Sequence, residues 1–410
     1  MNPPHLAVQY LESPPRGGNA RAVQARLRAA LDRLPIDAVL LGWALPPRLE
    51  EAVAAEVSRA RLPLYRWQPL LTANRHAESL LAWRVIGPTG NPVAGHNDLA
   101  VFTFLCPNRH AVLEWVLEQL ESIAASGLYQ GFFFDRIRFP SPAATPWHRL
   151  ACFCPECSRQ AAEAGLNLTD VRRALQELRE NGGAPALTHF LLTPPPAKAT
   201  QPLQAFLAFR AQSITRFVRL AAQTVRAYGL AVGLDCFSPS LAFMVGQDLP
   251  ALDACSDWIK LMTYPRVFGP AGLAFEYLDL ARWLMENNLS AKEALQTLTE
   301  ASGLPFPPSL DALAAHGLEA ECIRQEIQRG RALGIRHLLA GLALVTMPGI
   351  HTSDEAHLRA DFQAAQAADG LVLSWDLWHI PSRTLTVILE PESGGSNAQS
   401  LSSSRVNRSS

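Results

Sequence analysis

The chain of 410 residues is 48% hydrophobic and 18% charged and has a net charge of −1 at pH 7, a composition typical of a globular protein with a large core. This charge gives no reason to expect a nucleic acid or an anionic membrane as a partner. No apolar stretch is long enough to cross a bilayer, and residues 1–15 do not resemble a signal peptide, so the sequence predicts a cytoplasmic protein.

Eight short apolar runs, each typical of a buried parallel strand, alternate with segments of helical periodicity. The runs span residues 5–11, 37–45, 62–71, 131–134, 230–236, 257–264, 337–345 and 370–376. The helical segments span 20–34, 47–61, 111–126, 168–180, 204–228, 318–333 and 352–368. This alternation predicts an α/β fold, a parallel sheet closed into a (β/α)8 barrel. An open doubly wound sheet is the alternative, but no glycine-rich phosphate-binding motif stands at a strand-to-helix turn.

Two insertions and a tail interrupt this pattern. Residues 82–101 are expected to form an inserted hairpin, because residues 87–92 (GPTGNP) are dense in turn residues. Residues 265–317 are expected to form a long irregular loop after the sixth strand. Residues 391–410 contain Gly, Ser, Asn and Arg with few large apolar residues, which predicts a disordered tail after a single domain of residues 1–390.

Polar and aromatic residues stand where the predicted strands end, and the carboxyl ends of barrel strands carry active sites. Asp135 directly follows three phenylalanines, and a neighbouring arginine would keep its carboxylate ionised, as suits a nucleophile or base. The alternative is a structural ion pair. The other candidate catalytic acids are Asp235, Glu276 and Asp376. The candidate substrate-binding residues are Glu12, Trp43, Gln68, Arg136, Arg138, Lys260, Tyr264 and Trp375.

Each of the other acids also has a structural interpretation. Asp235 would then cap a loop, and Asp376 would belong to a tryptophan-rich rim. Glu276, in a glycine-rich loop, would either swing over the pocket or be solvated. Lys260 stands in an apolar strand, so it needs a carboxylate partner, for which Asp235 and Asp135 are the candidates. Acids and aromatic rings on one rim favour a carbohydrate ligand, because sugar faces stack on aromatic rings and paired carboxyl groups hydrolyse glycosides.

Three cysteines, Cys152, Cys154 and Cys157, have the spacing of metal ligands, and Cys106 ends the preceding apolar segment. Four thiolates form a closed tetrahedral Zn²⁺ site, which is structural because no position is left for water. His148 is the alternative fourth ligand. Free thiols and an iron–sulfur cluster are the other interpretations, although this spacing is not usual for a cluster.

The segment FFFDRIRFPS, preceded by CPNRHAVLEWVLEQL, resembles the corresponding region of bacterial glycoside hydrolase barrels of uncharacterised activity. The cysteines resemble the structural zinc site of the family 42 β-galactosidases. That resemblance implies a barrel, a zinc site and a carbohydrate substrate. Two departures speak against β-galactosidase activity: Asp135-Arg136 stand where that family has Asn-Glu, and residues 337–345 contain no glutamate.

Two functions follow as hypotheses. The first is a glycoside hydrolase in which Asp135 acts with a second carboxylate. The second is a barrel that binds a glycan or another polar ligand without catalysis. A metal-dependent hydrolase is disfavoured, because the histidines form no H-x-H or H-E-x-x-H motif.

Overall fold

The computed structural model describes residues 3–11, 19–43, 45–73, 80–96, 102–194, 201–352 and 354–387. Glu12, residues 97–101 of the first insertion and the expected tail of residues 391–410 lie outside this part of the chain. Among the described residues, no helix has the length and apolar character needed to cross a membrane.

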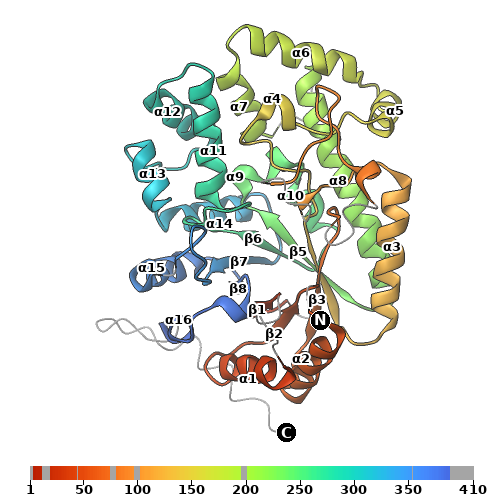
Figure 1. The fold of residues 1–410 in the computed structure, drawn as a ribbon, viewed down its shortest axis with the longest axis vertical. Helices are drawn as coiled ribbons and strands as arrows, with labels where there is room; N and C mark the ends of the chain where they lie inside the picture. Colours follow the sequence, from red (N-terminus) through yellow and green to blue (C-terminus); the bar gives the residue numbers. More distant parts are fainter. Residues whose placement is uncertain are drawn as a thin grey trace.

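Eight parallel strands form a closed barrel in sequence order, which confirms the predicted fold (Figure 1). The strands are β1 (Leu6–Tyr10), β2 (Ala38–Leu41), β3 (Leu64–Pro69), β4 (Gly131–Asp135), β5 (Ala231–Phe237), β6 (Trp258–Met262), β7 (Leu338–Ala343) and β8 (Gly370–Ser374). Each of the eight predicted runs overlaps one strand, and β4 and β5 extend one residue beyond their runs, because residues that are buried on both faces leave a continuous apolar signal.

Helices surround the barrel, and the seven predicted helical segments are all confirmed with small shifts of their ends (Figure 1). The helices are α1 (Ala20–Leu31), α2 (Pro47–Arg59), α3 (His110–Ala125), α4 (Pro146–Arg149), α5 (Pro155–Glu163), α6 (Leu168–Glu180), α7 (Ala184–Leu192), α8 (Pro202–Arg226), α9 (Pro239–Ala242), α10 (Leu249–Asp253), α11 (Leu273–Glu286), α12 (Ala291–Ser302), α13 (Leu310–His316), α14 (Glu321–Ala332), α15 (Glu355–Ala365) and α16 (Ser382–Val387). Short 3₁₀ turns cover Leu81–Trp83, Phe243–Val245 and Leu377–His379.

The long connection after β6 is helical, not irregular as expected. It contains α11, α12 and α13, and α11 buries Leu273, Tyr277, Leu280 and Leu284 at helical spacing. Helix α12 begins with a capping box, in which Ser290 and Glu293 satisfy each other's backbone N–H groups. The glycines and proline that open the segment hid this periodicity.

The first insertion forms isolated antiparallel bridges within its described residues. Ile86 pairs with Pro92 around the expected turn, and Arg84 pairs with Leu105. Thr72, which follows β3, pairs with Phe104. The insertion therefore lies along the chain that leaves β3 and brings residues 102–106 to that end of the barrel.

Large aromatic side chains fill the barrel interior. Phe133 of β4 stacks on Trp258 of β6 with ring centroids 5.2 Å apart and an angle of 12° between the planes. Gly233 of β5 leaves the space for this stack, since a Cβ atom there would lie 2.2 Å from the Trp258 ring. The other inward side chains include Ala7, Ala38, Leu40, Tyr65, Trp67, Ala231, Leu339 and Val372. Among the described residues, side chains therefore fill the interior of the barrel.

Candidate functional site

Asp135 and Asp235 lie side by side at the carboxyl ends of β4 and β5. The register pairs Phe133 with Gly233 and Phe134 with Leu234, so the next positions along the strands are the two aspartates. Because side chains alternate along a strand, both aspartates share the inward face with Phe133 and Gly233. The structure thus brings two predicted acids together at the barrel mouth.

Asp235 forms a buried ion pair with Lys260. The Nζ atom of Lys260 lies 2.9 Å from Oδ1 of Asp235, and the two side chains are 1% and 3% exposed. Burial raises the pKa of Asp235 to about 7; Lys260 opposes this rise and the charge of Asp135 adds to it. Burial lowers the pKa of Lys260, but Asp235 and Tyr264 outweigh it and raise the value overall. Asp235 is therefore the partner that Lys260 requires.

Asp135 is held by N–H donors. Nε1 of Trp67 donates to Oδ2 of Asp135 at 3.2 Å, and the backbone N–H of Arg136 donates to Oδ1 at 2.5 Å. Arg136 has a φ angle of 52°, a left-handed conformation that is uncommon for a residue with a side chain. The carboxylate is half-buried, so it remains open to a ligand.

Both arginines of this loop lie against aromatic rings. The guanidinium of Arg136 lies 5.1 Å from the Trp43 ring and 4.6 Å from the Phe102 ring. The guanidinium of Arg138 forms no ion pair with Asp135 within the described residues, and burial lowers its pKa to about 10.

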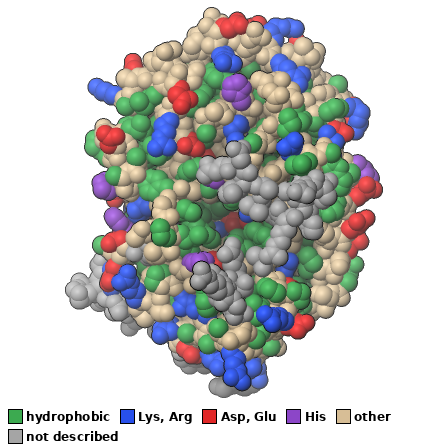
Figure 2. All heavy atoms as spheres, viewed as in Figure 1, with side chains coloured by type: hydrophobic (Ala, Val, Ile, Leu, Met, Phe, Trp, Pro, Cys, Tyr) green, Lys and Arg blue, Asp and Glu red, His purple; other side chains and the backbone are tan. Residues whose placement is uncertain are grey.

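Aromatic side chains line the mouth around the acids. Trp43 contacts Trp67 edge to face at 5.2 Å, and Tyr264 contacts Trp375 at 6.1 Å. Trp43 and Trp375 pack on the aromatic layer inside the barrel. Figure 2 shows a hollow near the middle of the face it draws, with hydrophobic and acidic side chains inside. Trp43 and Trp375 are partly exposed at this mouth, whereas Trp67 and Tyr264 are buried.

The remaining candidates are occupied with other contacts. Glu276 lies in the first turn of α11, not in a loop, and is 1% exposed; its carboxylate accepts hydrogen bonds from the Ser141 hydroxyl and the Ala271 N–H. Burial raises the pKa of Glu276. Asp376 accepts hydrogen bonds from the Leu11 and Trp378 N–H groups.

Gln68 lies on the outer face of β3, because the inward position is taken by Trp67. Its side-chain oxygen accepts a hydrogen bond from Arg66, which in turn contacts Tyr129 and Glu50 outside the barrel. Gln68 is therefore directed away from the barrel mouth. Trp67 donates to Asp135 at the mouth, but it was not among the residues predicted from the sequence. It stands two residues after Tyr65 on β3, so the two side chains share the inward face.

Four buried cysteines form a cluster outside the barrel. Sγ of Cys106 lies 3.5 Å from Sγ of Cys154 and 3.4 Å from Sγ of Cys157. Cys152 supplies the fourth sulfur atom, and the four lie within 4.8 Å of one another. A tetrahedral site with Zn–S bonds of about 2.3 Å separates its sulfur atoms by about 3.8 Å, so the cluster fits such an ion. His148 is exposed on α4 and is not part of the cluster.

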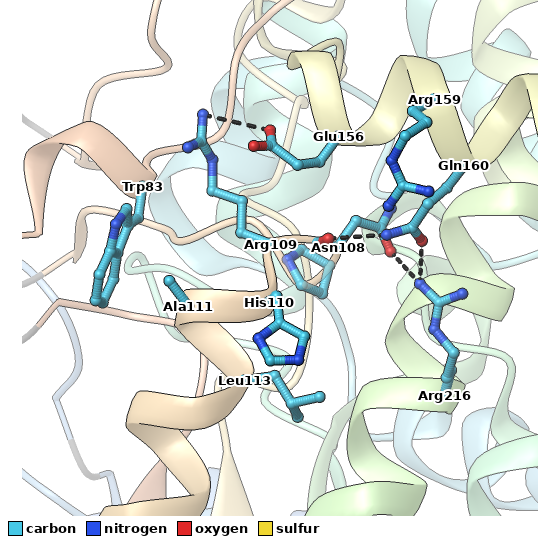
Figure 3. A pocket seen from close by; sticks show the side chains of 11 residues that line it. Trp83, Asn108, Arg109, His110, Ala111, Leu113, Glu156, Arg159, Gln160 and Arg216 are labelled. Carbon is cyan, nitrogen blue, oxygen red and sulfur yellow. Dashed lines mark hydrogen bonds and ion pairs between the residues drawn. The ribbon is translucent and has the colours of Figure 1, made fainter.

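Two polar side chains support the cluster. The Nδ2 atom of Asn108 donates to Sγ of Cys157 at 3.3 Å, and Arg216 donates to Oδ1 of Asn108 at 2.6 Å. Figure 3 shows Arg216 pointing towards Asn108 and Gln160 at the edge of a cavity of about 330 Å³. Arg210 is fully buried beside the cluster, where burial lowers its pKa to about 9 and Cys152 and Cys157 oppose that effect.

The fold is similar to those of solved glycoside hydrolases. A β-galactosidase from the Antarctic haloarchaeon Halorubrum lacusprofundi matches with a TM-score of 0.58 and 14% identity, over 94% of this chain and 57% of that chain. Gan42B, a GH42 β-galactosidase, matches with a TM-score of 0.53 and 10% identity, over 93% and 56%. An α-L-fucosidase from Paenibacillus thiaminolyticus matches with a TM-score of 0.51 and 13% identity, over 94% and 48%.

These likenesses show the fold. The chain spans less than two thirds of the length of each of these three proteins. No protein-family model matches the sequence, and no curated protein matches it.

Proposed function

We propose that the protein is a glycoside hydrolase whose catalytic pair is Asp135 and Asp235. The observation that carries this proposal is the placement of the two carboxyl groups on neighbouring strand ends in different surroundings. Asp235 is buried and its pKa is raised to about 7, which suits a general acid. Asp135 is half-buried and fixed by two N–H donors, which suits a nucleophile or base that must reach the sugar.

The proposed substrate is a carbohydrate held against the aromatic wall. Trp43 and Trp375 offer ring faces, and Tyr264 lies beside Lys260 at 5.1 Å from its Nζ atom. The glycosidase structures that share this fold are consistent with the proposal, although their identity of 10–14% leaves the sugar open.

The experiment is a survey of 4-nitrophenyl glycosides with the wild-type chain, Asp135→Asn and Asp235→Asn. Loss of an acid–base group costs roughly 10²- to 10⁴-fold in rate, so each variant is expected to lose at least about 10² in kcat/KM. Asp135→Asn is expected to keep its melting temperature within a few degrees. Asp235→Asn leaves the buried Lys260 without its partner and is expected to be less stable, so its rate is measured at a temperature at which it remains folded. Asp311→Asn, which changes an exposed acid on α13, is the matched control. Full activity in Asp135→Asn would overturn the assignment.

A barrel that binds a sugar without catalysis is the second candidate, and the Lys260–Asp235 ion pair favours it. A lysine 2.9 Å away stabilises the ionised carboxylate and so opposes proton donation. This candidate predicts saturable binding without product. Release of nitrophenol that depends on Asp135 would exclude it.

We also propose that the four cysteines hold Zn²⁺ as a closed structural site. Cys106 follows the segment that carries Phe102 and Phe104, and the other three cysteines follow the loop that carries Arg136 and Arg138. The ion would join the two segments that border the mouth, and it would supply no chemistry to the reaction.

A further inference from the structure

Arg138 is buried without a carboxylate partner. It is 6% exposed, and among the described residues no acid lies within the 4.0 Å of an ion pair. Within the described part of the chain, its Nη1 atom donates a hydrogen bond to the carbonyl oxygen of Phe139 at 3.1 Å. A guanidinium has five N–H donors, and burying a charge without acceptors is costly. Within the described part of the chain this guanidinium has one backbone acceptor, so its other N–H groups can receive a further partner.

The guanidinium lies at the barrel mouth. Its Cζ atom is 4.6 Å from the Phe104 ring and 4.6 Å from the Phe237 ring. Phe237 stands two residues after Asp235 on the same face of β5, and Phe104 pairs with Thr72 just after β3. Because β4 lies between β3 and β5, Arg138 is held over the end of β4, beside the proposed catalytic pair.

The acids around Arg138 already have donors of their own. Glu276 accepts from Ser141 and Ala271, and Asp235 is paired with Lys260. Their charges, with that of Asp135, oppose the burial that lowers the pKa of Arg138 to about 10, so the guanidinium stays charged at neutral pH. The mouth thus holds a fixed positive charge between two aromatic rings, with N–H groups that have no acceptor among the described residues.

We propose that Arg138 receives an anionic group of the substrate, so the sugar that this barrel accepts carries a carboxylate, as a hexuronic acid does. The proposal rests on the carbohydrate function proposed above. A guanidinium presents two parallel N–H groups at the spacing of carboxylate oxygens, and it is the side chain best suited to hold one. A sulfate ester offers the same pair of oxygens, and the experiment separates the two.

The experiment measures binding by isothermal titration of glucuronate and galacturonate, with glucose, galactose and galactose 6-sulfate as comparisons. The wild-type chain is expected to bind a hexuronate more tightly than its neutral counterpart. Charge-assisted hydrogen bonds of this kind change affinity by roughly 10- to 150-fold, and Arg138→Met is expected to lose that preference. Methionine fills the space between the Phe104 and Phe237 rings. Arg159→Met, which removes an exposed arginine on α5, is the matched control and should keep the preference.

Equal affinity for hexuronates and neutral sugars overturns the proposal, as does an absence of hexuronate binding. If Arg138→Met does not fold, Arg138→Lys keeps the charge but loses the paired N–H groups, and unchanged hexuronate affinity in that variant would contradict the proposal. If the chain binds galactose 6-sulfate more tightly than the hexuronates, the anionic group that Arg138 receives is a sulfate ester and not a carboxylate.

The failure of this inference can be told apart from the failure of the hydrolase. Turnover of neutral glycosides without hexuronate preference leaves the hydrolase and removes the anionic substrate. Hexuronate binding that depends on Arg138, without turnover of any glycoside, supports the anionic ligand and excludes the hydrolase.

Discussion

The ammonium group of Lys260 and the carboxylate of Asp235 meet inside the barrel at 2.9 Å, from neighbouring strands whose register pairs the two residues directly. The Oε1 atom of Gln9 on β1 lies 3.5 Å from the same ammonium group, and Tyr264 also stabilises the charged form of Lys260. Each charge is tolerated because the other is present. Removal of either one therefore has consequences for both stability and chemistry.

Lys260→Met is expected to destabilise the protein by about 3–5 kcal/mol, because it leaves a buried carboxylate unpaired. Urea unfolding measures the loss. The double variant Lys260→Met/Asp235→Asn is the control and should recover a large part of it. A single variant as stable as the wild type would show that the pair contributes nothing to stability.

The stability of the Lys260→Met variant is expected to depend on pH. The pKa of Asp235 is raised to about 7 in the folded chain, against an ordinary value of about 3.9 in the unfolded chain. A raised folded pKa stabilises the fold at low pH, and this contribution is lost as the pH rises through about 4 to 7. Without Lys260 the pKa rises further, so the variant should lose more stability at pH 8 than at pH 5. Equal losses at both pH values would contradict this assignment.

If Asp235 is the general acid, kcat/KM should fall as the pH rises above about 7, because the carboxyl must be protonated to donate. The pH profile of the wild-type chain measures this limb. Asp235→Asn should lack the limb and have lower activity throughout, whereas the exposed Asp311→Asn should reproduce the wild-type curve. A profile that is flat from pH 6 to 9 would assign the acid to another group.

The sequence predicted the barrel because its strands are buried on both faces, and it predicted the cysteine cluster because three of the four cysteines stand within six residues of one another. It did not predict α11, whose first turn follows Gly269 and Gly272, or the burial of Glu276 within it. The outward direction of Gln68 follows from strand alternation and was overlooked. The position of Arg138 between Phe104 and Phe237 had no local signal, because those rings come from segments far apart in the chain.

Cys154→Ser is expected to abolish binding of about one zinc ion per chain and to lower the melting temperature, because a structural ion contributes its binding energy to folding. Elemental analysis and thermal unfolding measure the two effects. Cys255→Ser is the matched control: its thiol is buried outside the cluster and donates to the Ala251 carbonyl oxygen, a bond that serine can keep. Metal-free wild-type protein would refute the zinc site.

Asn108→Ala is expected to weaken zinc binding by roughly 10- to 100-fold without removing a ligand, because groups that hydrogen-bond to metal ligands orient them and tune their charge. The Asn108 amide donates to Sγ of Cys157 at 3.3 Å and to the Ser213 hydroxyl at 3.0 Å, while its oxygen accepts from Arg216. Competition with a chromophoric chelator measures the affinity. Asn181→Ala, at the exposed end of α6, should leave it unchanged. An affinity in Asn108→Ala equal to that of the wild type would mean that the thiolates alone hold the ion, and that the Asn108 contact only packs α3 against α8.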